Sequence, residues 1–145
     1  AGAVAAGGSD EEVAVLERLG THMGVLFQLK DDELGIFGDQ EKLGKPVGSD
    51  IREGKKTLYH HFLMNDPDKS IHDKVRKLFG KKEMTIKEVE FVRKRIQELG
   101  IQEKIEEIAR GITVRAEEDI AALACDADRK ELLSGLLFFN STREK

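Results

Sequence analysis

Residues 20–35 read GTHMGVLFQLKDDELG, and this stretch decides the fold class predicted for the chain. Its apolar residues recur every three or four positions, as on one face of an amphipathic helix. Upstream, Ser9 and Glu12 have the spacing of a capping box, which marks a helix start. Proline is absent until Pro46. We therefore predict one long helix from Ser9 to about Leu34.

One stripe of this helix carries Gly20, Gly24, Gln28, Asp31 and Gly35, which are three or four positions apart. Glycine inside a helix costs up to about 1 kcal/mol relative to alanine. Several glycines on one stripe therefore suggest that something approaches the backbone closely. Close helix–helix packing and a binding site are both consistent with this spacing.

The rest of the chain also reads as helical. Residues 36–49 form a glycine-punctuated loop, and Ser49 or Asp50 can cap a second helix that runs to about Met64. Further helices are expected over residues 69–79, 85–99, 101–124 and 128–139, with a second capping box at Thr85 and Glu88. No run alternates as a strand would. The predicted fold class is all-α, an antiparallel helix bundle.

The helix over residues 85–99 combines an apolar stripe with a basic one. The apolar stripe consists of Val89, Val92, Ile96 and Leu99. The basic side chains, expected to lie on a solvated face, are Lys87, Arg93, Lys94 and Arg95.

Composition narrows the class of protein. The 145 residues suit a single segment, and 28 acidic against 24 basic residues give a net charge of −4. This balance excludes a uniformly basic surface, so no nucleic-acid partner is expected. The lone Cys125 forms no intramolecular disulfide, and no long uncharged apolar span is present. We expect a cytoplasmic protein without membrane insertion.

Asp31 and Asp32 are the candidate metal ligands. Adjacent carboxylates repel each other unless a cation lies near them, and Mg²⁺ commonly joins one or two carboxylates to substrate phosphates. An arbitrary pair of aspartates is more often a solvated acidic surface. Asp31 is better placed than Asp32, since it shares the stripe with Gln28 whereas Asp32 is turned about 100° away.

A longer pattern identifies the chain as similar to a known family. The pattern comprises Phe27-Gln28-x-x-Asp31-Asp32, Gly38-Asp39, Leu43-Gly44-Lys45-Pro46, Gly48-Ser49-Asp50-Ile51 and Gly54-Lys55-Lys56-Thr57. It resembles the second aspartate-rich region of trans-isoprenyl diphosphate synthases, the polyprenyl synthetase family. The sequence of its loop is most similar to that of archaeal members. The resemblance implies the C-terminal half of the isoprenoid synthase fold, incomplete in this chain.

The resemblance implies a geranylgeranyl diphosphate synthase-like prenyltransferase that condenses an allylic diphosphate with isopentenyl diphosphate. It assigns Lys45 and Lys55 as catalytic residues that contact the allylic diphosphate. Phe27 and Gln28 would help to bind substrate, and Mg²⁺ would be bound by the carboxylates of the preceding helix. Asp39 and Asp50 are expected to orient neighbouring side chains, and the full-length enzyme is expected to be a homodimer.

Two features depart from the family pattern. The third aspartate that usually follows Asp31 by four positions is replaced by Gly35, which puts a secondary contribution in doubt. The family's first aspartate-rich motif has no counterpart in the sequence. Because the metal cluster of the family lies between two carboxylate sets, the chain is expected to be inactive alone. Product length is not indicated, because the residues that set it lie near the first motif.

Rival interpretations rest on fewer residues. Four histidines could suggest zinc, but no Cys or His completes a ligand set. The residues after Asp31 lack the alternating oxygen ligands of a calcium loop and the second metal motif of terpene cyclases. A non-catalytic helical accessory or regulatory subunit of a prenyltransferase is the main alternative. Such a subunit need not keep Asp31, Lys45 and Lys55 in register.

Overall fold

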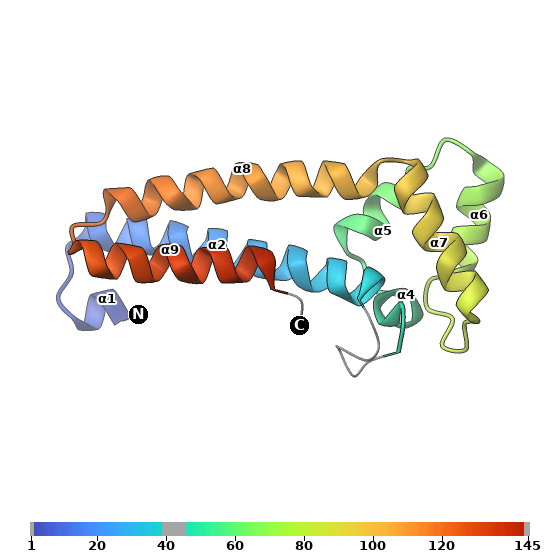
Figure 1. Cartoon of the computed structure of the whole chain (residues 1–145), viewed down its shortest axis with the longest axis horizontal. Coiled ribbons are helices and arrows are strands. Elements are labelled where there is room, and N and C mark those ends of the chain that lie inside the picture. The colour runs from blue at the N-terminus through green and yellow to red at the C-terminus, as the bar shows by residue number, and fades with distance from the viewer. Residues whose placement is uncertain (1, 39–45, 144–145) are drawn as a thin grey trace. The chain divides into compact units, whose positions relative to one another are not determined.

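The computed structural model describes residues 2–38 and 46–143, which form helices joined by turns, with no strand among them (Figure 1). The prediction of an all-α class is confirmed. The chain divides into two compact units: residues up to 30 with 108–143 form unit 1, and residues 31–107 belong to unit 2. No described helix is both long and apolar enough to cross a bilayer.

Unit 1 contains α1 (Gly2–Ala5), most of α2 (Asp10–Phe37), most of α8 (Ile101–Ala122) and α9 (Ala127–Thr142). The predicted capping box starts α2: the Ser9 amide donates to the Glu12 carboxylate at 2.9 Å, and the Glu12 amide donates to Ser9 Oγ at 3.2 Å. The predicted helix is thus confirmed, and it continues three residues past Leu34.

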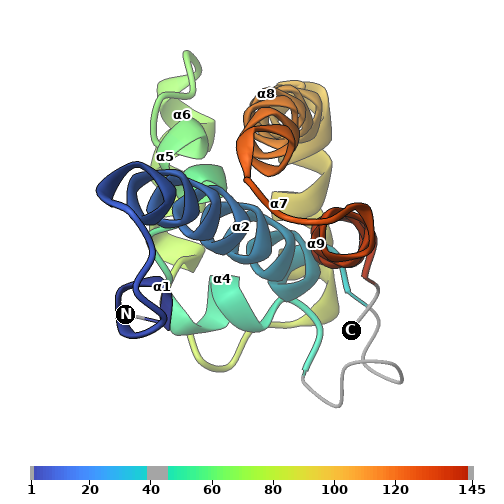
Figure 2. The same cartoon turned by 90° about the vertical axis from the view of Figure 1, so that its left-hand side faces the viewer.

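The core of unit 1 lies between α2, α8 and α9, which run side by side in Figures 1 and 2. Its buried members are Val15, Leu19, Leu26, Ala116, Ile120, Leu123 and Leu137. A hydrogen bond also joins α2 to α8: Arg18 Nε donates to Oδ1 of the buried Asp119 at 3.1 Å. The apolar spacing of α2 is therefore what attaches it to α8 and α9.

Unit 2 contains the end of α2, α4 (Ser49–Glu53), α5 (Leu58–Leu63), α6 (Lys69–Leu78), α7 (Ile86–Glu98) and the start of α8. The single helix predicted over residues 49–64 is wrong. Gly54 ends α4 in the left-handed conformation with φ of 69°, and Thr57 Oγ1 then caps α5 by accepting from the His60 amide. Glycine adopts that conformation without a Cβ penalty, so it reverses the chain between the two helices.

The core of unit 2 gathers around α7, whose predicted capping box and apolar stripe are both confirmed. Val89, Val92 and Ile96 have no exposed surface. Other buried apolar members are Ile36, Ile51, Tyr59, Leu63, Val75, Leu78, Met84, Ile101 and Ile105. This core fixes the end of α2 and α4 within one unit, and both carry residues of the candidate site.

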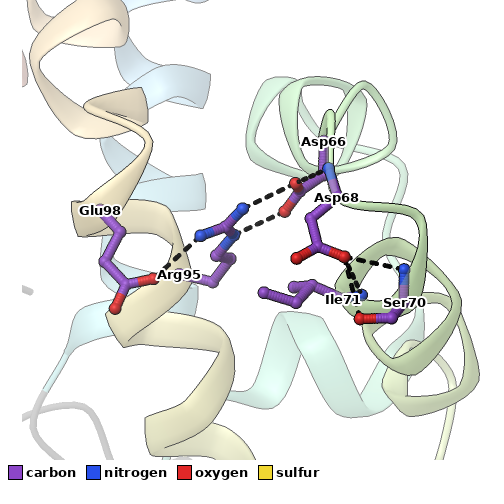
Figure 3. A network of polar contacts seen from close by, with 6 residues as sticks. All are labelled: Asp66, Asp68, Ser70, Ile71, Arg95 and Glu98. Carbon is purple, nitrogen blue, oxygen red and sulfur yellow. Dashed lines mark hydrogen bonds and ion pairs between the residues drawn. The ribbon is translucent and has the colours of Figure 1, made fainter.

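The expectation that Arg95 is solvated is wrong, because its side chain is only 16% exposed. Its guanidinium donates from Nε to Asp66 Oδ2 at 2.6 Å and from Nη2 to Oδ1 at 2.7 Å, as Figure 3 shows. Glu98 accepts from Nη1 at 3.0 Å. Nearby, Asp68 accepts from the amides of Ser70 and Ile71 at the start of α6. The network ties α7 to the turn before α6.

Arg93 is a second exception to the solvated face predicted for this helix. Its side chain is 17% exposed, and Nε donates to the Ile36 carbonyl at 2.8 Å. That carbonyl belongs to the last turn of α2, whose final carbonyls lack partners within the helix. Lys87 and Lys94 are exposed as predicted. Arg93 therefore anchors the end of α2 on α7.

Candidate functional site

The last turns of α2 carry the two aspartates in different surroundings. Asp31 is partly exposed, whereas Asp32 is buried with 6% of its surface accessible. The charge of Asp31 acts on Lys55, and that of Asp32 acts on Tyr59. Consecutive helix positions are turned about 100° apart, which accounts for the separation. Asp31 is therefore the more accessible carboxylate, and Asp32 belongs largely to the interior of unit 2.

Lys55 is folded back onto α4 by the turn at Gly54. Its backbone amide donates to the Asp50 carbonyl at 3.0 Å, and its Nζ lies 2.7 Å from Asp50 Oδ1. The Lys55 side chain is 36% exposed, whereas that of Asp50 is 4% exposed. The helix-ending glycine thus brings a partly accessible ammonium against a buried carboxylate.

Electrostatics keep this ammonium charged. The hydrogen bond to Asp50 raises the pKa of Lys55 above its ordinary value, and the charges of Asp50, Glu53 and Asp31 act in the same direction. Partial burial opposes the shift. Because the ordinary pKa of lysine is already well above neutral, Lys55 is a cation throughout the physiological range.

Tyr59, at the start of α5, is a buried aromatic residue on which the charge of Asp32 acts. Tyr59 is 2% exposed, and its ring meets the ring of Phe37 edge to face with centroids 6.0 Å apart. Burial raises the pKa of its phenol, and the charges of Glu33 and Asp32 add to the effect. The phenol is therefore neutral in the physiological range.

Asp50 is in contact with α2 as well as with Lys55. Its carboxylate lies against the bare Cα of Gly35, and Ser49 Oγ is 3.4 Å from the Gly35 carbonyl. The close approach to the backbone that the glycine stripe predicts is thus found at Gly35, where the approaching group is the Asp50 carboxylate. The contact joins residues fifteen positions apart, and the only signal for it in the sequence is glycine itself within a polar helix stripe.

Phe27 and Gln28 are on the part of α2 that belongs to unit 1, and both are exposed. The guanidinium of Arg143 lies over the Phe27 ring at 3.8 Å, and its Nη2 donates to the Phe27 carbonyl at 3.3 Å. This cation–π contact was not anticipated, and no motif marks Arg143. It places a positive charge beside Phe27, one of the predicted substrate-binding residues.

Two predicted residues of the loop, Lys45 and Asp39, lie outside the described residues. Their assignments stay predictions. Three residues of the predicted site, Asp31, Asp32 and Lys55, lie in unit 2. Asp50 links this group, because its carboxylate contacts both Gly35 and Lys55.

The described residues contain no group of three or more His, Cys, Asp or Glu side chains that could hold a metal ion. Asp31 and Asp32 provide at most two carboxylates. That number suits Mg²⁺, which commonly binds one or two carboxylates and completes its shell with water and substrate phosphates. The donor set therefore fits a metal that arrives with a diphosphate better than a metal held by protein alone.

The histidines have other surroundings. His22 Nδ1 lies 3.0 Å from Asp119 Oδ2, and His72 Nδ1 lies 3.1 Å from Asp73 Oδ1. The His60 ring packs edge to face on Phe79 at 4.8 Å between centroids. Burial lowers the pKa of His60, and the charge of Lys56 adds to the effect. These contacts place the three rings on separate elements.

Comparison with known proteins shows which sequences this chain is similar to. Residues 1–96 match the family model of polyprenyl synthetase. A geranylfarnesyl diphosphate synthase of Aeropyrum pernix is 35% identical over 147 residues, covering 99% of this chain and 44% of that protein. A geranylgeranyl diphosphate synthase of Methanosarcina mazei is 32% identical, covering 99% of this chain and 42% of that protein.

A solved structure has the same fold. The geranylgeranyl pyrophosphate synthase of Corynebacterium glutamicum, complexed with isoprenyl diphosphate and magnesium, matches with a TM-score of 0.86 and 29% identity. The match covers 95% of this chain and 39% of that one. The chain thus spans less than half the length of each of these three relatives.

Proposed function

Because the chain belongs to the polyprenyl synthetase family, we propose that it forms one half of the catalytic site of a trans-prenyltransferase. The reaction would condense an allylic diphosphate with isopentenyl diphosphate, as in geranylgeranyl diphosphate synthases. The observation that carries the proposal is the Lys55 ammonium, which is held at a buried carboxylate and interacts with Asp31 at the end of α2. An anionic ligand bound there would meet a fixed cation and a carboxylate pair.

Lys55 would stabilise the leaving diphosphate. When the allylic carbon–oxygen bond breaks, negative charge develops on the diphosphate oxygens, and a preorganised donor at that position lowers the barrier. The three donors of an ammonium allow Lys55 to keep its bond to Asp50 while it donates to the ligand. Lys45, by resemblance, would supply a second cation.

Asp31 would hold Mg²⁺, with Asp32 and Gln28 in support and Phe27 beside the substrate. Bound Mg²⁺ would neutralise charge on the diphosphate and orient it for departure. The partial exposure of Asp31 supports this division of roles, since a ligand can reach its carboxylate more readily than the buried one of Asp32.

We also propose that the 145-residue chain alone does not catalyse the condensation. The sequence has one adjacent pair of aspartates, whereas the proposed mechanism needs two facing carboxylate sets around the metal and diphosphate. Incubation of the purified chain with labelled isopentenyl diphosphate, an allylic diphosphate and Mg²⁺ should yield no prenyl product. Product formation by the chain alone would show that the site is complete.

Binding of inorganic diphosphate tests the half-site directly. We expect the ³¹P NMR signal of diphosphate to shift when the chain is added in the presence of Mg²⁺. Without Mg²⁺, addition of the chain should leave the signal unchanged. Lys55→Gln should weaken binding about tenfold or more, because a hydrogen bond to a charged group contributes about 1.5–3 kcal/mol. Lys56→Gln is the matched control, since Lys56 is an exposed neighbour. Equal binding by both variants would contradict the assignment of Lys55.

A further inference from the structure

The contact between α2 and α4 at Gly35 leaves no room for a side chain. A Cβ built on Gly35 would lie 2.5 Å from Asp50 Oδ1 and closer still to Cγ and Oδ2. Atoms without a bond between them do not approach so closely. Asp50 itself is 3% exposed, so it has little space into which to withdraw. Position 35 therefore accommodates only glycine while Asp50 keeps its place.

The other glycines of the α2 stripe differ from Gly35. A Cβ on Gly20 or Gly24 would meet no atom of the described residues within 4 Å. Each of these glycines carries the same intrinsic cost within a helix. Among the three, close approach to the backbone is therefore a property of Gly35, and the group that approaches is the Asp50 carboxylate.

The Lys55 ammonium compensates the charge of Asp50. Oδ1 lies 2.7 Å from Lys55 Nζ, while Oδ2 is buried and has no hydrogen-bond partner among the described residues. A buried carboxylate is costly unless it is paired. Lys55 is bound to Asp50 by its backbone amide as well. The lysine is thus held at both ends, and its head is oriented by a carboxylate that α2 holds in place.

We propose that Asp50 is a positioning residue that uses the space left by Gly35 to hold the Lys55 ammonium beside the acidic end of α2. This inference rests on the proposed function, in which the ligand of Lys55 is a diphosphate. A pre-oriented ammonium spends less conformational entropy on binding than a free lysine side chain. Gly35 is then a requirement of the site, and its missing side chain is what lets the lysine be aligned.

A double-mutant cycle tests the contact. Gly35→Ala should lower the urea midpoint of unfolding, although alanine favours a helix more than glycine does. In an Asp50→Ala background the same change should leave the midpoint unchanged or raise it, because the obstructing carboxylate is gone. Gly24→Ala is the matched control, expected to have no lowering effect in either background.

The reactivity of Lys55 tests the positioning itself. Asp50→Asn keeps the volume of the side chain and removes its charge, so acylation of Lys55 by an amine-reactive ester should become severalfold faster. Peptide mass spectrometry measures Lys55 and the exposed Lys56 in one experiment, and Lys56 should not change. Loosening of the whole fold would accelerate the acylation of both lysines.

Mg²⁺-dependent binding of inorganic diphosphate, measured by ³¹P NMR, should weaken about tenfold in Asp50→Asn, as expected for the loss of one charge-assisted hydrogen bond.

The outcomes separate this inference from the proposed function. Failure of the wild-type chain to bind diphosphate in Mg²⁺ would contradict the proposed function and, with it, the ligand assigned to Lys55. If the wild type binds, two results would overturn the positioning role. One is an unchanged ratio of Lys55 to Lys56 acylation in Asp50→Asn, and the other is an equal effect of Gly35→Ala in both backgrounds.

Discussion

Asp31→Asn is expected to abolish measurable Mg²⁺-dependent binding of diphosphate. The substitution keeps the shape of the side chain and removes the negative charge that would hold the metal. Loss of a residue that merely supports a metal ligand costs 10–100-fold in affinity or activity, and loss of a ligand should cost at least about as much. The measurement is the ³¹P shift of inorganic diphosphate titrated with the chain in Mg²⁺, compared with wild type.

Two further variants, compared with Asp31→Asn in the same assay, test whether its effect is specific. Asp10→Asn removes one charge from the exposed first turn of the same helix and should bind diphosphate as wild type does. Asp32→Asn should weaken binding less than Asp31→Asn and destabilise the fold more, because Asp32 is buried. If Asp31→Asn still binds diphosphate, or if Asp32→Asn has the stronger binding defect, Asp31 is not the principal metal ligand.

Asp66→Ala is expected to lower the free energy of unfolding by roughly 3 kcal/mol, as removal of one partner from a buried ion pair does. The Asp66 side chain is fully buried and accepts two hydrogen bonds from Arg95. Without it, the Arg95 guanidinium, whose side chain is 16% exposed, loses both of these bonds and retains the bond to Glu98. The measurement is urea denaturation followed by circular dichroism at neutral pH.

A second variant separates the buried charge from the lost contacts. Arg95→Met in the Asp66→Ala background removes the uncompensated charge and should recover part of the stability. Asp73→Ala on α6, whose aspartate side chain is 68% exposed, should change the midpoint little. A double variant that is as unstable as the sum of its single variants would show that Asp66 and Arg95 contribute independently.

The same pair predicts a dependence on pH. The hydrogen bonds from Arg95 hold the pKa of the Asp66 carboxyl below its ordinary value of 3.8. The unfolded chain therefore takes up this proton at higher pH than the folded chain does, so the contribution of Asp66 is complete above about pH 3.8 and is lost as pH falls through the lower folded pKa. The advantage of wild type over Asp66→Asn in urea midpoint should shrink below pH 3.8; a constant difference would contradict this.

Most helices were predictable from local pattern. Capping boxes at Ser9 and Thr85 and the apolar spacing between them determined where α2 and α7 begin. These signals act within a few residues, so sequence alone reveals them. The single helix predicted over residues 49–64 is wrong for a local reason as well, because Gly54, with φ of 69°, ends α4.

The candidate site was predictable in part. Asp31 and Asp32 were selected as adjacent carboxylates and Lys55 by resemblance to a family motif, and the structure places all three in unit 2. Their catalytic and metal-binding roles are proposals that the variants above test. The contact of Arg143 with Phe27 was not predictable, since it joins residues more than a hundred positions apart without a motif at Arg143.

The sequence by itself determined the helical class, the start of the long helix and the spacing of its aspartates, because periodicity and capping are local. Only the tertiary structure decided which charges are buried. Arg93 and Arg95 were expected in solvent, yet partners 57 and 29 positions away draw them inward. The same holds for Gly35: the glycine stripe predicts a close approach to the backbone, but only the fold shows that it occurs at Gly35 and that the approaching group is the Asp50 carboxylate. A side chain's cost or use depends on what the fold packs beside it.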